Sequence, residues 1–144
     1  MNKIISSIPL LLMIFLSGCQ SNINNSSQET EVIEDDNGFI DFYHKFHTDS
    51  LFQMAHISFP LEGTPSVSDT VYDGTGTYYH QKEDWLMHRP IDMSTGEFKN
   101  EFDMGEVLVT ERIINNQNFM LVRRFYFNGK DWSLIYYGDL NPIK

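Results

Sequence analysis

The sequence predicts an α+β domain in which N-terminal helices pack on an antiparallel sheet, and two patterns indicate this fold class. The first is a stripe of aromatic residues at positions 39, 42, 43 and 46, the spacing of one face of an amphipathic helix. The second is a pair of aromatic and β-branched runs that meet at Asn128-Gly129, a dipeptide typical of hairpin turns. A further strand at 106–114 would extend this hairpin into a three-stranded meander.

Residues 1–18 are predicted to be the signal peptide of a lipoprotein. Lys3 supplies a positive start, 4–15 is an apolar run too short to span a bilayer comfortably, and Leu-Ser-Gly-Cys follows at 16–19. This end resembles the lipobox of bacterial lipoproteins, in which the cysteine becomes the acylated N-terminus. Cys19, the only cysteine, would then carry several acyl chains and anchor the protein durably. The alternative is an ordinary secretory signal with an incidental cysteine.

The lipidated Cys19 and an acidic flexible tether are expected to occupy residues 19–37, and a single domain residues 38–144. The tether is rich in Ser, Asn and Gln and then in Asp and Glu, a composition that buries too little apolar surface to fold. The chain's 11 Phe, 7 Tyr and 2 Trp indicate a real core in the part that follows. Its net charge of −10 argues against nucleic acid as a partner, because phosphate binding needs a basic surface.

The helical region is expected at 38–57, with a break near Thr48-Asp49. The break is predicted because 50–53 has the spacing of a capping box that starts a second helix. The side chains expected to face solvent are those of Asp41, His44, Lys45 and His47. The region that follows is predicted to contain an edge strand or an extended exit segment at 57–61, a loop at 63–76, short strands at 78–79 and 84–89, and a polar excursion at 92–103.

A two-residue turn at Asn128-Gly129 would place Phe125 opposite Trp132 and Arg123 opposite Leu134. One face of the hairpin then becomes the candidate core, and it carries Phe119, Leu121, Arg123, Phe125, Phe127, Trp132, Leu134 and Tyr136.

The register of 106–114 depends on the length of the next loop. A three-residue loop at 115–117 would place Val107, Val109, Glu111 and Ile113 on the face of Arg123. A two-residue loop would place Leu108, Thr110, Arg112 and Ile114 there instead. We favour the three-residue loop, because Glu111 would compensate a positive charge that is costly to bury.

The Phe-Tyr-His-Lys-Phe-His-Thr-Asp-Ser run that opens 42–61 is similar to the signature of a family of short lipoproteins of Bacteroides-type bacteria, a domain of unknown function. The lipobox, the acidic tether and the closing Gly-Lys-Asp-Trp-Ser-Leu-Ile-Tyr-Tyr at 129–137 agree with it. The family resembles the NTF2-like, cystatin-like α+β cone, in which N-terminal helices pack in the concavity of a curved antiparallel sheet. The resemblance therefore implies this fold for 38–144, and it supplies no catalytic residues.

The residues themselves predict no catalytic group, no cofactor and no metal site. His44 and His47, with Asp41 three positions earlier, have a spacing at which a helix can offer metal ligands. Successive steps of three drift around a helix, however, and these positions form its polar face, so we expect a solvated surface. The serines lack a Gly-x-Ser-x-Gly motif, and Cys19 is used by the anchor.

Arg123 is the one charged residue on the predicted aromatic face of the hairpin. On one interpretation it points between sheet and helices and lines a pocket for a small anionic or aromatic ligand. The residues that would share this pocket are Glu111, His56, Trp132 and Tyr136. On the other interpretation, which is the commoner arrangement, its stem covers the aromatics while its head reaches water or Glu111.

Together these observations predict a lipid-anchored protein of the cell envelope, in the outer membrane facing the periplasm. We expect a non-catalytic binding or scaffolding module for a small ligand or an envelope protein. The alternative is a cavity enzyme of the NTF2-like isomerase or dehydratase type, with His56 or an aspartate as base, and it rests on fold analogy alone.

Overall fold

The computed structural model describes residues 37–69 and 75–143, which belong to the second of two compact units of the chain, Val32–Lys144. The predicted signal peptide, Cys19 and nearly all of the predicted tether lie outside the described residues. Among the residues that the structure describes, neither helix has the length and apolar composition needed to cross a bilayer.

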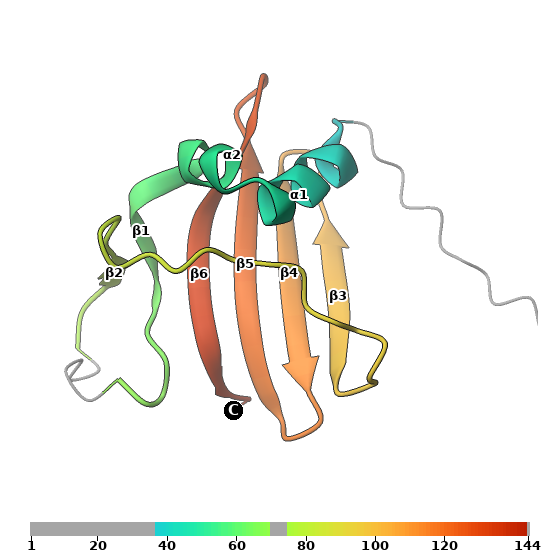
Figure 1. Ribbon diagram of the computed structural model, residues 1–144. Helices are drawn as coiled ribbons and strands as arrows, with labels where there is room; N and C mark the ends of the chain where they lie inside the picture. The colour runs from blue at the N-terminus through green and yellow to red at the C-terminus, as the bar shows by residue number, and fades with distance from the viewer. Residues whose placement is uncertain (1–36, 70–74, 144) are drawn as a thin grey trace, which may run out of the picture. The chain divides into compact units, whose positions relative to one another are not determined.

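Two short helices precede six strands that form one sheet (Figure 1). The elements are α1 (Phe39–Thr48), α2 (Ser50–Ala55), β1 (Ile57–Thr64), β2 (Tyr78–His80), β3 (Phe98–Met104), β4 (Leu108–Asn115), β5 (Phe119–Phe127) and β6 (Trp132–Pro142). The strand order is β2-β1-β6-β5-β4-β3. All neighbours are antiparallel except β1 and β6, which run parallel, so the sheet is mixed.

This architecture contradicts the predicted fold class, an α+β cone of the NTF2-like type built on an antiparallel sheet. A six-stranded mixed sheet dominates, and the helices have only 10 and 6 residues. Part of the error lies at 98–104, which was expected to be an irregular polar excursion and instead forms β3 against β4. The rest lies in β1, expected at an edge, which instead inserts between β2 and β6 and runs parallel to β6.

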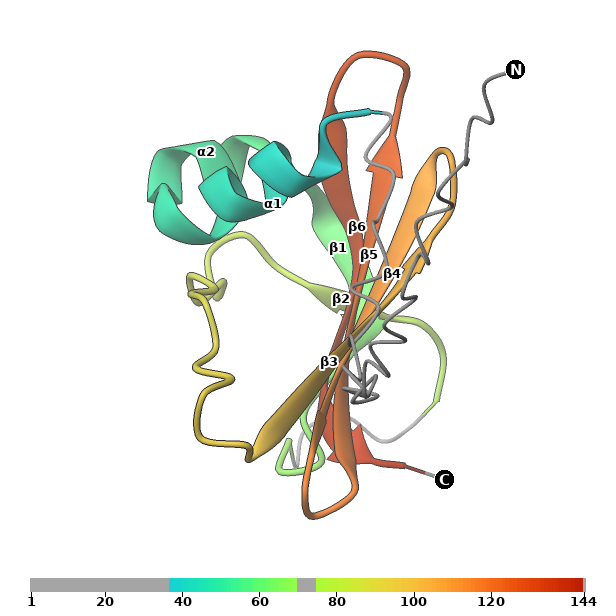
Figure 2. The ribbon, with the colours of Figure 1, turned by 90° about the vertical axis from the view of Figure 1, so that its right-hand side faces the viewer.

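Both helices lie on one face of the sheet, together with the irregular segment 81–97 that connects β2 to β3 (Figure 2). We call 81–97 the crossing segment, because it passes over β6, β5 and β4 below the helices. It includes 84–89, for which a strand was wrongly predicted. Its course is held by Gln53, which makes the four hydrogen bonds described next.

Gln53 is fully buried on α2 and satisfies both ends of its amide. Its Nε2 donates to the carbonyl oxygens of Phe46 (2.7 Å) and His88 (2.9 Å). Its Oε1 accepts from Trp85 Nε1 (3.3 Å) and from the backbone N–H of His88 (2.8 Å). Because a buried amide is costly unless all its groups are paired, these bonds tie the crossing segment firmly to the helices.

The helices form largely as their sequence predicts. Asp49 ends α1 and caps α2, accepting hydrogen bonds at 3.0 Å from the N–H groups of Leu51 and Phe52, so the cap is Asp49 and not the predicted Ser50. The inward face of α1 carries the predicted Phe39, Phe42 and Phe46. It also carries His47, which is 2 % exposed although it was expected to face solvent.

The turn between β5 and β6 is longer than predicted. Residues 128–131 form a four-residue loop in which Asn128 Oδ1 accepts from the N–H groups of Lys130 and Asp131, both at 2.9 Å. Phe127 therefore pairs with Trp132. The predicted register was two residues away, and a shift of two keeps every side chain on its face.

A bulge in β6 places Tyr137, and not the predicted Tyr136, on the inner face of the sheet. Phe125 pairs with Leu134 but Arg124 pairs with Tyr136, so one extra residue, Ile135, is accommodated in β6. Tyr137 consequently lies opposite Arg123 on the inner face, in place of the predicted Tyr136. Tyr136 lies on the outer face, where the Arg124 guanidinium sits 4.5 Å from its ring centroid.

The face predicted for β4 is confirmed, although its register differs by two residues from the one that a loop at 115–117 would give. A loop at 116–118 connects β4 to β5, and Glu111 pairs directly with Arg123. Val109, Glu111 and Ile113 are at most 1 % exposed, so this face of β4 belongs to the core beneath α1.

Candidate functional site

A buried network of polar side chains lies between α1 and strands β3 to β5. At its centre, Arg123 Nη1 donates to Glu111 Oε2 at 3.0 Å, and the two side chains are 3 % and 0 % exposed. Glu111 also accepts from Asn100 Nδ2 on β3 at 2.9 Å and from the hydroxyl of Tyr43 on α1. Three donors from three other elements thus satisfy one carboxylate inside an aromatic core.

His47 completes the network as a neutral acceptor. Its Nδ1 lies 2.9 Å from the carbonyl oxygen of Tyr43, which can only accept, so Nδ1 carries the proton. Its Nε2 lies 3.0 Å from Arg123 Nη1, which can only donate, so Nε2 is unprotonated. The pKa of His47 agrees with this assignment, because burial and then the charge of Arg123 lower it to about 4.

Tyr43 is held in its protonated form. Burial, and then the Glu111 carboxylate, raise the pKa of its hydroxyl well above the usual value. The hydroxyl therefore acts as a permanent donor to Glu111 near neutral pH.

A cavity of about 360 Å³ opens beside the network, and we call it the Arg123 cavity. Its polar lining residues are Tyr43, His44, His47, Asn100 and Arg123, and its apolar ones are Ile40, Pro90, Ile91, Met93 and Ile113. The apolar walls come from α1, β4 and the end of the crossing segment. Arg123 Nε and Asn100 Oδ1 are buried without a hydrogen-bond partner in the described part of the chain. Each such group costs about 1–3 kcal/mol, so the network beside this cavity contains one buried donor and one buried acceptor that are not satisfied.

The structure separates most of the predicted site residues. Arg123 lines the cavity and Glu111 supports it from behind. His56 instead stacks on Phe52 with ring centroids 3.9 Å apart. Trp132 packs under α1, where its Nε1 donates to the Asn37 carbonyl oxygen at 3.0 Å, and Tyr136 lies on the outer face. The predicted five-residue pocket is therefore wrong as a cluster, and only the Arg123–Glu111 pair belongs to the observed site.

Three residues of the network were missed by the sequence prediction. Asn100 could not be found because its strand was not recognised. Tyr43 was predicted to face the core, but nothing in its spacing indicated a hydrogen bond to a carboxylate 68 residues away. His47 follows Tyr43 by one helical turn, which was the only available signal that it could share the inner face.

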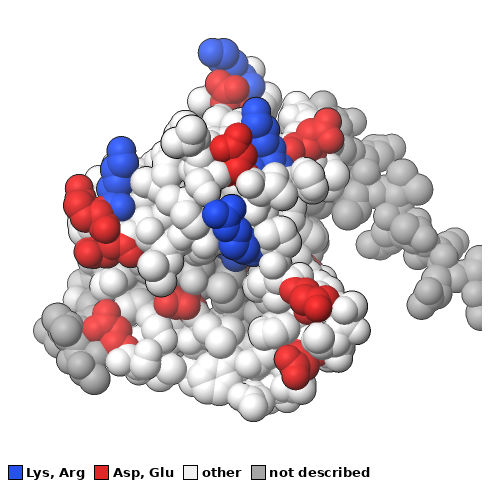
Figure 3. Space-filling view, in the orientation of Figure 1, with Lys and Arg blue, Asp and Glu red and all other residues white. Residues whose placement is uncertain are grey.

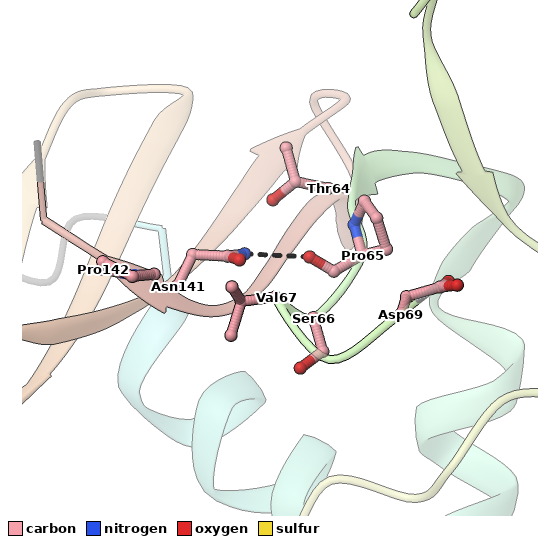
Figure 4. A pocket seen from close by; sticks show the side chains of 7 residues that line it. All are labelled: Thr64, Pro65, Ser66, Val67, Asp69, Asn141 and Pro142. Atoms are coloured by element: carbon pink, nitrogen blue, oxygen red, sulfur yellow. Dashed lines mark hydrogen bonds between the residues drawn. The ribbon is translucent and has the colours of Figure 1, made fainter. Parts of the chain in front are cut away.

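A larger cavity of about 510 Å³ lies between the ends of β1 and β6 (Figure 4). It is lined by Thr64, Pro65, Ser66, Val67, Asp69, Asn141 and Pro142. Asn141 Nδ2 donates to the Pro65 carbonyl oxygen at 2.9 Å and so ties the two strand ends together. None of the predicted site residues lines it.

Comparisons of the chain with protein-family models, with curated proteins and with solved structures found no match. The resemblance to short lipoproteins therefore stays a prediction, and the site is interpreted from its own chemistry. Within 37–69 and 75–143, no three His, Cys, Asp or Glu side chains come together as metal ligands would. His44 and His47, the pair with ligand spacing, diverge, one exposed and the other buried.

The buried ion pair predicts a pattern of mutant stabilities. Arg123→Met should lower the free energy of unfolding by about 3–5 kcal/mol, because it leaves the Glu111 carboxylate buried without its cation. The double variant Arg123→Met with Glu111→Leu should recover part of this loss, but it leaves the Tyr43 hydroxyl without its acceptor. Adding Tyr43→Phe removes that hydroxyl and should recover more. Urea unfolding measures all three. The control is Arg124→Met on the outer face, and an equal cost for Arg123→Met and this control would contradict the assignment.

The neutral buried histidines predict a pH dependence. Burial lowers the pKa of His88 to about 2 and that of His47 to about 4, whereas the unfolded chain binds these protons near pH 6.5. The contribution of these histidines to the free energy of unfolding is therefore fully present above pH 6.5. It is lost as the pH falls, by about 2 kcal/mol per histidine between pH 7 and pH 5. Urea unfolding at both pH values should show this loss.

In the same measurement, His47→Gln should remove about half of the histidine-dependent loss. His44→Gln, on the exposed side of the same helix, is the matched control and should retain it. A pH dependence that is the same in the two variants would show that His47 is not a buried neutral group.

Proposed function

We propose that this protein is a lipid-anchored binding module of the cell envelope, and that the Arg123 cavity is its ligand site. The observation that carries this proposal is a guanidinium only 3 % exposed in the wall of a cavity whose other side is apolar. A cavity of about 360 Å³ falls in the size range of small-molecule sites, which combine apolar walls with a few fixed polar groups.

The arrangement favours a ligand with an apolar body and a hydrogen-bond-accepting head, such as a carboxylate. Arg123 lines the cavity and can only donate, so the group that it binds there must be an acceptor. The charge of Glu111 is shared among Arg123, Tyr43 and Asn100, so part of the guanidinium remains available to a second acceptor. Ile91 and Met93 of the crossing segment, with Ile113 of β4, would contact the apolar body.

The state of the titratable groups supports binding rather than catalysis. A general base near neutral pH needs a free lone pair and a pKa close to the working pH. His47 has both ring nitrogens engaged and a pKa of about 4. The Tyr43 hydroxyl is committed to Glu111, and its pKa is raised.

Surface charge supports a partner other than nucleic acid. On the face that carries the helices and the crossing segment, lysines and arginines are scattered among acidic side chains and form no basic patch (Figure 3). The whole chain has a net charge of −10, which opposes the counterion release on which phosphate-backbone binding depends.

The anchor is tested by substitution of Cys19. Cys19→Ala should abolish lipid attachment and release the protein from membranes, because an acidic, polar tether has no membrane affinity of its own. Metabolic labelling with a radioactive fatty acid, followed by membrane fractionation, measures both effects. Ser21→Ala, two residues further along, is the matched control and should remain labelled. An unlabelled wild-type protein would exclude the lipoprotein assignment.

The ligand site is tested with octanoate as the probe and octanamide as its uncharged counterpart. Isothermal titration calorimetry should detect octanoate binding, and octanamide should bind several-fold more weakly because it lacks the charge that pairs with Arg123. Ile91→Trp, which fills the cavity, should abolish binding, whereas Leu51→Trp at an exposed position of α2 should not. No binding of octanoate, or equal binding by the two variants, would contradict the proposed site.

A further inference from the structure

A separate cavity of about 340 Å³ lies at the other end of the crossing segment, against β2 and β6. We call it the Trp85 cavity. It is lined by Trp85, Tyr137, His80, His88, Asp84, Asp139 and Leu86, so rings and carboxylates dominate and no lysine or arginine contributes. Gln53 bonds Trp85 and His88, which fixes this end of the crossing segment independently of the Arg123 cavity.

Four rings form a continuous aromatic wall in this cavity. Trp85 and Tyr137 meet nearly edge to face, with centroids 5.4 Å apart. His88 packs 4.5 Å from each of them, and His80 lies 5.0 Å from Tyr137. The faces of tryptophan and tyrosine carry negative electrostatic potential, so such a wall attracts cations.

The backbone of β1 is adapted to hold this wall. His80 Nε2 donates to the Tyr137 carbonyl oxygen at 3.0 Å, across strand β1 that separates β2 from β6. A Cβ atom at Gly63 would lie 1.8 Å from that oxygen and 2.9 Å from His80 Nε2. Only glycine at position 63 therefore allows β1 to pass while His80 contacts β6.

The cavity has acidic groups without basic partners. Neither Asp84 nor Asp139 forms an ion pair with a lysine or arginine among the residues that the structure describes. Asp139 accepts from the Tyr137 hydroxyl at 3.1 Å and from the Leu140 N–H at 2.7 Å, which orients its carboxylate without neutralising it. His88 adds no positive charge, because burial lowers its pKa to about 2. Its Nδ1 is buried and has no hydrogen-bond partner in the described part of the chain.

We propose that the Trp85 cavity binds a small organic cation of the quaternary ammonium class, between the rings of Trp85 and Tyr137 and the carboxylates of Asp84 and Asp139. Aromatic rings with nearby acids are the established recognition chemistry for such cations, whose methyl groups need apolar contact while their charge needs a counter-ion. An inorganic divalent ion fits less well, since such ions need several oxygen ligands and the described residues offer no group of three acidic or imidazole ligands.

The experiment uses the full-length protein, with choline as the probe and 3,3-dimethyl-1-butanol as its neutral isostere. Isothermal titration calorimetry should show choline binding, and the isostere should bind about tenfold more weakly because it has the same shape without the charge. Absence of choline binding, or equal affinity for the isostere, would overturn the proposal.

Two variants and a control locate the site. Asp84→Asn and Asp139→Asn should each weaken choline binding several-fold, as each removes one of the two carboxylates. Asp103→Asn, an exposed acid on β3 at the opposite edge of the sheet, changes the net charge equally and should leave the affinity unchanged. Urea unfolding verifies that the variants remain folded. An equal loss in all three variants would indicate a general charge effect and not this cavity.

Discussion

The buried ion pair between Arg123 and Glu111 is the constraint on which the helix-covered face depends. Burying a guanidinium and a carboxylate among aromatic rings costs several kcal/mol per ion unless further hydrogen bonds accompany their attraction. Here those further bonds come from Asn100 of β3 and from Tyr43 and His47 of α1. The pair therefore fixes more than one strand register. It sets the rotation of α1, because only one orientation brings both Tyr43 and His47 to the network while the phenylalanine stripe stays in the core.

The crossing segment connects the packing of the helices to the two proposed binding sites, because it lines both cavities. It contains no helix or strand, and besides a few turns of its own its position depends on side chains elsewhere. Gln53 supplies that dependence through its bonds to Trp85 and His88. With Trp85 and His88 fixed in this way, the segment lines two cavities of opposite character. One has a guanidinium in its wall, and the other has two carboxylates and neither lysine nor arginine. The crossing segment thus lines two separate cavities, one proposed to bind a hydrogen-bond-accepting ligand and the other proposed to bind a cation.

Local patterns were sufficient to predict the parts of the fold that depend on local periodicity. The aromatic stripe of α1, the strands around Asn128-Gly129 and the placement of Glu111 on the same face as Arg123 follow from periods of 3.6 and 2 and from one loop length. The exchange of Tyr136 for Tyr137 could not be predicted, because a single-residue bulge has no clear sequence signal yet moves the side chains that follow it to the opposite face, here up to a second register shift between Met120 and Val122. Strand β3 was missed because an edge strand can be polar, and His47 because the partner that makes its burial possible lies 76 residues away. The parallel pairing of β1 with β6 leaves no turn signature at all, and it is the feature that most separates this sheet from the predicted antiparallel cone.

The same non-local contacts explain why site prediction failed more than strand prediction. His56, Trp132 and Tyr136 were grouped with Arg123 because each is an aromatic or titratable residue expected on one face. The structure uses His56 and Trp132 to complete helix packing, and it leaves Tyr136 under Arg124 outside that face. Besides the residues of α1, the Arg123 cavity is lined by Asn100 of β3 and by Pro90, Ile91 and Met93 of the crossing segment, and these two segments have the weakest patterns in the chain. Binding surfaces commonly occupy such irregular segments held over a regular scaffold, since a regular strand already commits its backbone and one of its faces to packing. In this protein the hydrogen bonds of Gln53 hold the irregular segment in place as a cavity wall, and the ion pair supplies the polar group of the wall opposite.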